Sequence, residues 1–282
     1  MFRKILFMLF VLLLAAVPAL AQKLTADEVV AKHLGSIGTA ETRAGIQTIV
    51  MTGEATAKFL SQKDLLLKGR IVFASAGEKN FLGIGLNSNN YPGEQFVYDG
   101  KKSKVAFTQN GKRSSLGDFI QSNDLLLEDS LLSGVLSSSW VLSNLTAKKS
   151  KLSFEGIKKI NGKEVYVLSY SRKGSGDLSI SLFFDKETFR HVRTEYKRVT
   201  SAGIGSKPED SSQLSEVRYK IAEDFSDFKE EKGLTLPHSY HILYAEEGAR
   251  STGNLEVEWT FNLLEFAFNE KLDPGTFNTD QK

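Results

Sequence analysis

The sequence predicts a mainly β (α+β) protein built on one large curved antiparallel sheet or barrel, with a short helix before it and a helical segment within it. Three observations support this class. From Ile46 the hydrophobic period changes from 3.6 to 2 residues, and runs rich in Val, Ile, Thr, Tyr and Phe follow one another. Turn dipeptides such as Asp99-Gly100, Asn110-Gly111 and Asn161-Gly162 separate the runs. The chain lacks the helix between strands that a parallel α/β fold would require.

The first 21 residues have the pattern of a cleavable secretory signal peptide. Arg3 and Lys4 precede an apolar run over residues 5–17 and the small-residue site Ala19-Leu20-Ala21. The run has about a dozen residues, fewer than the roughly 20 that a membrane-spanning helix needs. We therefore expect cleavage after Ala21 and a mature chain, residues 22–282, outside the cytoplasm. An uncleaved N-terminal anchor is the alternative.

Charge and cysteine content narrow the possible partners and compartment. The chain has 36 Lys and Arg against 34 Asp and Glu, and removal of Arg3 and Lys4 with the signal leaves 34 of each. No basic block or basic face with interleaved aromatics stands out, which excludes nucleic acid as a partner. The chain has no cysteine, so it carries no disulfide and no cysteine for lipidation at the cleavage site. The periplasm of a Gram-negative bacterium fits this composition best.

A helix is predicted at the start of the mature chain. Thr25 and Glu28 form a capping-box pattern. Apolar residues recur behind it at near-helical spacing, and two glycines supply stop signals: Val29, Val30, Leu34 and Ile37, with Gly35 and Gly38. We expect a short amphipathic helix of about ten residues.

About a dozen strands are predicted in two sets. The first set comprises 47–59, 65–74, 80–86, 95–98 and 104–109. The second comprises 151–159, 164–172, 177–185, 191–199, 215–224, 236–245 and 255–263. Apolar and polar residues alternate most regularly over 178–184 and 255–263. This alternation predicts that one face of the sheet is buried and the other is in contact with water.

Residues 116–140 interrupt the strands with a helical composition. A stripe at i, i+3, i+4 and i+7 is formed by Leu125, Leu126, Leu127, Leu131, Leu132, Val135 and Leu136. Ser122 or Asn123 would cap the start of this helix. A second interruption, at 200–213, is polar and predicts an exposed loop, to which we assign no catalytic or binding role.

Residues that carry catalytic or metal chemistry are few: His33, His191, His238 and His241, with no thiol. His238 and His241 lie three apart on a strand, where alternating faces keep them from one metal. We expect His33 to be a hydrogen-bonded core residue. Glu256 and Glu258 are spaced like paired glycosidase carboxylates, but a wetted strand surface explains them better. The common nucleophile, phosphate-loop and metal motifs are missing, so we expect no enzymatic activity, metal or cofactor.

Several short segments also carry a family resemblance: 27–38 (DEVVAKHLGSIG), 49–53, 69–73, 182–185, 193–196 and 266–274. With the order of the elements, they resemble periplasmic outer-membrane lipoprotein-sorting proteins of the LolA/LolB-like superfamily. The resemblance covers most of the mature chain and implies a single domain with an unclosed half-barrel of about 11–12 strands. Its apolar concave face would be covered by helices acting as a lid. The chain is longer than typical carriers of this family, with the excess in 116–149 and 200–213.

In that family the cavity holds acyl chains. The resemblance therefore implies a lining of Phe73, Phe81, Phe96, Phe107, Leu125, Leu132, Leu136, Leu182, Phe184, Trp259 and Phe261, where each buried methylene would gain roughly 0.8 kcal/mol. It implies a monomeric carrier that moves lipids or lipoprotein acyl chains between the inner and outer membranes, with transport proteins in both as partners. An ordinary packed core would use the same aromatic residues.

Two other function classes stay open. One is a periplasmic sensor or regulatory module on the same fold, which would bind a membrane protein instead of lipid. The other is a secreted hydrolase, which needs a catalytic cluster that the sequence does not show. Under the carrier hypothesis, Leu132→Asp is expected to weaken ligand uptake more than folding, because a lid contributes less to the core.

Overall fold

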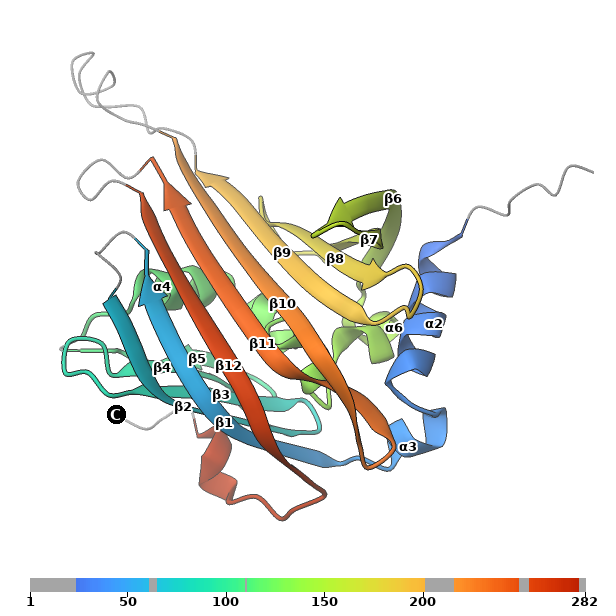
Figure 1. The fold of residues 1–282 in the computed structure, drawn as a ribbon, viewed down its shortest axis with the longest axis horizontal. Coiled ribbons are helices and arrows are strands. Elements are labelled where there is room, and N and C mark those ends of the chain that lie inside the picture. Colours follow the sequence, from blue (N-terminus) through green and yellow to red (C-terminus); the bar gives the residue numbers. More distant parts are fainter. Residues whose placement is uncertain (1–23, 61–64, 110, 201–215, 249–253, 279–282) are drawn as a thin grey trace, which may run out of the picture.

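The structure is a computed structural model that describes residues 24–60, 65–109, 111–200, 216–248 and 254–278. The expected signal peptide, Asn110 and nearly all of the expected 200–213 loop lie outside these residues. Within them, twelve strands form one antiparallel sheet (Figure 1). None of the helices in the described ranges is long and apolar enough to cross a membrane.

The strands fall into two sets, as predicted. The first set is β1 (Thr48–Phe59), β2 (Leu65–Ala76), β3 (Lys79–Leu86), β4 (Gly93–Tyr98) and β5 (Ser103–Val105). The second set is β6 (Lys151–Ile160), β7 (Lys163–Ser171), β8 (Ser179–Asp185), β9 (His191–Thr200), β10 (Val217–Glu231), β11 (Leu234–Glu247) and β12 (Leu255–Phe268). The main differences are a shorter β5 and a longer β10.

The order of the strands explains the path of the chain. Each set is a meander, and β1 pairs with β12 so that the first and last strands meet in the middle of the sheet. The order ends at β5 and at β6, so the sheet is open and the predicted unclosed half-barrel is confirmed. Because β5 and β6 are opposite edges, the segment between them has to cross the sheet. We call this segment, residues 106–150, the insertion. Figure 1 shows it in green behind the central strands.

The insertion is not the single amphipathic helix that its leucine spacing predicts. It contains α4 (Ser115–Gln121), α5 (Leu125–Glu128), α6 (Leu145–Lys148) and two 3-10 turns, η2 (Gly134–Leu136) and η3 (Val141–Ser143). Ser130 and Ser133 adopt left-handed backbone angles, with φ of 50° and 68°, which end a helix. Leu125, Leu126 and Leu127 are all buried, whereas a straight helix with one apolar stripe would expose one of them.

The predicted N-terminal helix is confirmed as α2 (Ala26–Ile37), followed by the short α3 (Ala40–Ala44). Its capping box is complete: the Glu28 N–H donates to Thr25 Oγ1 at 3.2 Å, and the Thr25 N–H donates to Glu28 Oε2 at 2.8 Å. Its inner face buries Val29, Val30 and His33. The helix runs past Gly35 and ends at Gly38.

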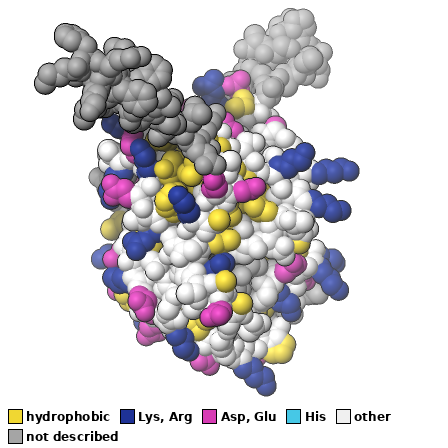
Figure 2. Space-filling model, turned by 90° about the vertical axis from the view of Figure 1, so that its right-hand side faces the viewer, with side chains coloured by type: hydrophobic (Ala, Val, Ile, Leu, Met, Phe, Trp, Pro, Cys, Tyr) yellow, Lys and Arg dark blue, Asp and Glu magenta, His cyan; other side chains and the backbone are white. Residues whose placement is uncertain are grey.

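The surface beside α2 and α3 faces the viewer in Figure 2. Lys and Arg side chains are interspersed with Asp and Glu over the described part of this face, and hydrophobic side chains lie between them. The outer face of the sheet carries two small apolar clusters of its own. One is formed by Val165, Val167 and Phe183. The other packs Phe277 of the 3-10 turn η4 (Pro274–Phe277) against Ala74 and Val97.

Candidate functional site

The candidate site is the interior between the concave face of the sheet and the insertion. Alternation along each strand directs every second side chain to this face, as in Ile180, Leu182 and Phe184 of β8. The leucines of the insertion pack against them in one buried cluster. Nine of the eleven predicted lining residues belong to it: Phe73, Phe96, Leu125, Leu132, Leu136, Leu182, Phe184, Trp259 and Phe261. Side chains of the insertion therefore occupy the concave face.

The other two predicted lining residues do not lie in this interior. Phe81 of β3 is half-buried against the outer cluster around Ala74 and Val97, because its neighbour Leu82 takes the inner position of the alternation. Phe107 follows the end of β5, is 56% exposed, and lies under the guanidinium of Arg113 at 4.3 Å from the ring centroid. Placing Phe81 and Phe107 on the concave face was wrong.

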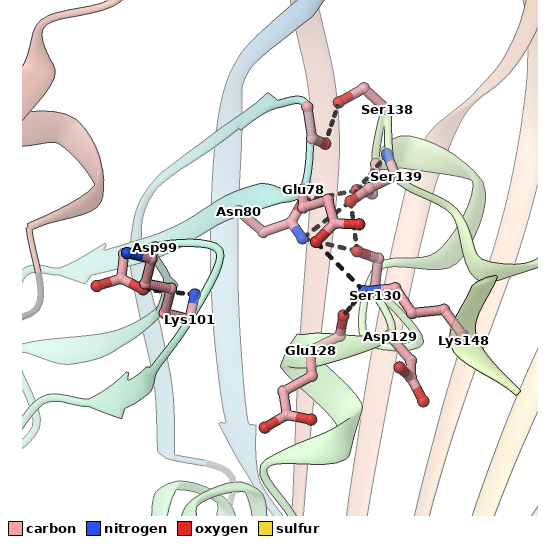
Figure 3. Close-up of polar contacts among 12 residues, drawn as sticks. Glu78, Asn80, Asp99, Lys101, Glu128, Asp129, Ser130, Ser138, Ser139 and Lys148 are labelled. Carbon is pink, nitrogen blue, oxygen red and sulfur yellow. Dashed lines mark hydrogen bonds and ion pairs between the residues drawn. The ribbon is translucent and has the colours of Figure 1, made fainter. Parts of the chain in front are cut away.

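Asn80 of β3 ties the sheet to the insertion. Its side-chain nitrogen donates to Ser130 Oγ at 2.7 Å and to Ser139 Oγ at 3.3 Å, and its Oδ1 accepts from Ser137 Oγ at 2.6 Å. Figure 3 shows Asn80 pointing from the strand toward Ser130 and Ser139. Asn80, Ser130 and Ser137 are buried, so these hydrogen bonds fix the insertion at a place shielded from water.

A second polar contact joins the insertion to β7. Asp129, which is fully buried, accepts hydrogen bonds from Tyr170 Oη and from Arg172 Nη1, both at 2.7 Å. Arg172 Nη2 donates to Glu128 Oε2 at 2.7 Å. Burial raises the pKa of Asp129, although Tyr170 and Arg172 act in the opposite direction. The ion pairs fasten the end of α5 to the residue that follows β7.

Glu223 of β10 makes a third contact and is also fully buried. Its Oε1 accepts from the Ser133 backbone N–H at 2.8 Å and from Tyr240 Oη, and its Oε2 accepts from Tyr196 Oη at 2.5 Å. Burial raises the pKa of the Glu223 carboxyl to about 7, although the two tyrosines and Ser133 lower it. The left-handed turn at Ser133 thus depends on a buried carboxyl that lies 90 residues further along the chain.

Replacing Glu223 with Gln is expected to change how stability depends on pH. The folded-state pKa lies above the unfolded value of 4.5, so the native protein takes up a proton between pH 7 and 4.5 that the unfolded chain does not. This uptake raises the free energy of unfolding as pH falls, by roughly 3 kcal/mol at about 1.4 kcal/mol per pKa unit. The difference in free energy of unfolding between wild type and Glu223→Gln should therefore move by roughly 2–3 kcal/mol, in favour of wild type, from pH 8 to pH 5. Urea unfolding measures it, and an equal difference at both pH values would contradict the assignment.

His33 is the hydrogen-bonded core residue that the sequence predicts. Its Nε2 accepts from Trp140 Nε1 of the insertion at 3.0 Å, so its Nδ1 carries the proton and donates to the Phe189 carbonyl at 3.1 Å. Burial lowers the pKa of His33 to about 4, which keeps the ring neutral. His238 and His241 lie beside Glu231 and Asp224 instead of sharing a ligand. The described residues contain no cluster of three His, Asp or Glu side chains placed to bind a metal.

The buried carboxyls are the site residues that the sequence reading missed. A signal was present, because Glu223 shares its strand face with Ile221 and Phe225, and Glu94 shares its face with Phe96 and Tyr98. A lone carboxyl within an apolar face calls for a buried partner. The sequence does not show which residue is the hydrogen-bond partner of each carboxyl, because partners such as Ser133 for Glu223 lie far away along the chain.

A cavity lies at each end of the filled interior. The first, of about 240 Å³, is near α3 and the starts of β1 and β11, between Arg43, Ile49, Trp140 and Leu236. The second, of about 260 Å³, is near the end of β1 and the start of β12, between Phe59, Tyr91, Leu255 and Trp259. Both volumes are below the roughly 300 Å³ at which pockets for drug-sized ligands begin. A long acyl chain fits the interior only if the insertion moves.

Comparison with known proteins gives matches among solved structures alone, since no family model and no curated protein matches the chain. A LolA superfamily protein from Nitrosomonas europaea is 14% identical, with a TM-score of 0.45 over 91% of this chain and 99% of its own. An outer membrane lipoprotein-sorting protein domain from Vibrio parahaemolyticus is 16% identical, with a TM-score of 0.44 over 89% and 98%. A DUF1329 family protein from Desulfovibrio piger is 10% identical, with a TM-score of 0.41 over 89% and 95%. The first two carry the names of the family that the sequence resembles.

Proposed function

We propose that the protein is a periplasmic binder and carrier of lipids or lipoprotein acyl chains, which enter the concave face when the insertion moves away from it. The observation that carries this proposal is the composition of the interface. The sheet offers a continuous apolar face, and the element that covers it is a set of short helical turns and not a further layer of strands. The protein would bind its ligand without converting it chemically.

The energetics of the exchange set what the ligand has to supply for the insertion to move. When the insertion leaves the sheet, apolar area becomes exposed on the insertion and on the sheet. This exposure costs about 25 cal/mol per Å². An acyl chain restores burial on the sheet, so the net cost is the exposure of the insertion plus its lost polar contacts. Asn80, Asp129 and Glu223 hold the closed form, and each keeps other hydrogen bonds or gains water when the insertion leaves. A ligand shifts such an equilibrium by its preference for the open form.

Lipid content tests binding directly. Protein purified from the periplasm of its host should carry acyl lipids that mass spectrometry identifies after extraction, and the ligand-free protein should take up a fluorescent fatty acid. The N-terminal sequence of the same sample should begin at Gln22. If the purified protein carries no acyl lipid and the ligand-free protein takes up no fluorescent fatty acid, the proposal is refuted. A single stoichiometric membrane-protein partner found by cross-linking, without lipid, would favour the regulatory alternative.

A disulfide between β2 and the insertion is expected to block uptake reversibly. The Ser138 backbone N lies 3.0 Å from Ser75 Oγ, so the two Cα atoms are within the roughly 7 Å that a disulfide allows. The chain has no other cysteine to interfere. Oxidised Ser75→Cys/Ser138→Cys protein should take up the fluorescent fatty acid at least about ten-fold more slowly, and reduction should restore uptake, because the locked insertion cannot leave.

A matched control places the disulfide inside the insertion. Ser130 Oγ and Ser139 Oγ are 2.6 Å apart, and a disulfide between them does not attach the insertion to the sheet. Both forms of Ser130→Cys/Ser139→Cys protein lose the hydroxyls that accept from Asn80, so the oxidised form is compared only with the reduced form of the same variant, and the two should bind equally well. Equal uptake by the oxidised and reduced Ser75/Ser138 pair would show that ligand enters without displacement of the insertion.

A further inference from the structure

The second end cavity has a polar wall as well as an apolar one. Its apolar side continues into the concave face through Phe59, Leu116, Leu255, Val257 and Trp259. Its polar side is formed by Asn90, Tyr91, Thr108, Ser114 and Ser115. A ligand with a hydrocarbon chain and a polar head would meet matching chemistry at this end of the interior.

Glu94 lies behind the polar wall. It occupies an inner position of β4, on the same face as Phe96, and is only 2% exposed. Its Oε1 accepts a hydrogen bond from Tyr91 Oη at 2.5 Å, and Tyr91 Oη accepts one from Trp259 Nε1 at 3.1 Å. Both Tyr91 and Trp259 line the cavity. Glu94 is therefore one hydrogen bond away from the ligand space.

The second oxygen of Glu94 is unsatisfied. Oε2 is buried and makes no hydrogen bond of good geometry with the described residues, although the Ser114 hydroxyl, which accepts from the Gly117 N–H, lies close enough to act on the carboxyl. Burial raises the pKa of Glu94 to about 7, and the nearby Asp118 carboxylate raises it further, whereas the Ser114 and Tyr91 hydroxyls lower it. A buried acceptor without a donor costs about 1–3 kcal/mol, more when it is charged. A hydrogen-bond donor would satisfy this oxygen, and a positive charge on the donor would pair with the carboxylate.

We propose that this cavity binds the polar head of the lipid and that the head carries a primary amine. The inference rests on the proposed carrier function and narrows its ligand class. The ammonium group would donate to Glu94 Oε2 once the side chains of Tyr91 or Ser114 give way, and the attached chain would run along Phe59 and Val257 under the sheet. A carboxylate head would meet the Glu94 carboxylate as a like charge, which disfavours a plain fatty acid at this end.

Three probes of equal chain length separate the possibilities: dodecylamine, dodecanol and dodecanoate, each competing with a bound fluorescent alkyl ligand at neutral pH. Wild-type protein is expected to bind dodecylamine at least ten-fold more tightly than dodecanoate, with dodecanol between them. Glu94→Gln keeps the shape of the side chain and removes its charge, so it should lose this preference. Glu256→Gln, on the outer face of β12, is the matched control and should keep it.

The outcomes distinguish failure of the amine site from failure of the proposed carrier function. Equal binding of the three probes by wild type, or a preference that survives Glu94→Gln, overturns the amine site and leaves the carrier function standing. Binding of none of them overturns both. The order of the three wild-type affinities needs no variant, so the test holds even if Glu94→Gln fails to fold.

Discussion

Leu132→Asp is expected to destabilise the protein by more than about 4 kcal/mol, a large share of the roughly 5–15 kcal/mol that stabilises a typical domain. Leu132 is 5% exposed and belongs to the main core cluster. Removing a buried leucine side chain costs about 2–5 kcal/mol, and the new carboxylate adds the cost of burial without a partner. This expectation replaces the one drawn from the sequence, in which a lid residue would affect ligand uptake more than folding. Thermal unfolding of the variant measures the effect.

Leu264→Asp is the matched control for that substitution. Leu264 lies on β12 with 63% of its surface exposed, so the same change of residue type meets water instead of the core. Its effect should stay within about 0.5–1 kcal/mol. If Leu132→Asp were as mild as Leu264→Asp, the insertion would not be packed in the core, and the filled interior described above would be wrong.

Arg172→Met is expected to lower the free energy of unfolding by about 3–5 kcal/mol at neutral pH. The substitution keeps the apolar stem of the side chain but removes the charge opposite Asp129, which stays fully buried. Tyr170 alone then satisfies the carboxylate. The loss should be smaller at pH 5 than at pH 8, because Asp129 can take up a proton when its cation is gone. Urea unfolding at the two pH values checks both statements.

The double variant Asp129→Asn/Arg172→Met tests whether the loss comes from the unpaired charge. An asparagine can still accept the hydrogen bond from Tyr170, and no charge remains in the core. We expect the double variant to be more stable than Arg172→Met alone. Additive losses from the two single substitutions would show instead that the ion pair is not coupled.

The same variant connects stability with the proposed function. Arg172 fastens α5 to the sheet, so its removal favours the open form as well as the unfolded chain. Arg172→Met protein that is still folded should therefore take up the fluorescent fatty acid faster than wild type. Slower uptake by the folded variant would mean that α5 stays in place when ligand binds.

The strands were predictable because strand formation depends on local alternation. Runs such as 151–159 and 255–263 show the period of two, and turn residues such as Asn161-Gly162 place the hairpins with both residues at positive φ. The predicted strand ends were wrong where charged residues obscure the alternation of apolar and polar residues. The end of β10, up to Glu231, continues as strand through a polar stretch because β11 pairs with it as far as Leu234.

The insertion and the site were only partly predictable, because their structure depends on partners that are distant in sequence. The leucine spacing indicated a buried helical segment but not its breaks at Ser130 and Ser133. Those turns are held from outside, by Asn80 and by Glu223. Phe81 and Phe107 show the same limit, since aromatic character alone does not say which face of a sheet a residue occupies.

The sequence by itself determined the antiparallel strands, the capped N-terminal helix and the apolar segment between the two strand sets, while the unclosed form of the sheet was implied by the family resemblance. The strands and the helix follow from periodicity, caps and turns, which act over a few residues. Only the tertiary structure decided that the insertion fills the concave face, that Asp129 and Glu223 secure it, and that Glu94 borders a cavity with one oxygen unsatisfied. The reason is physical: β5 and β6 become opposite edges only when β1 pairs with β12, and that pairing forces the segment between them across the sheet.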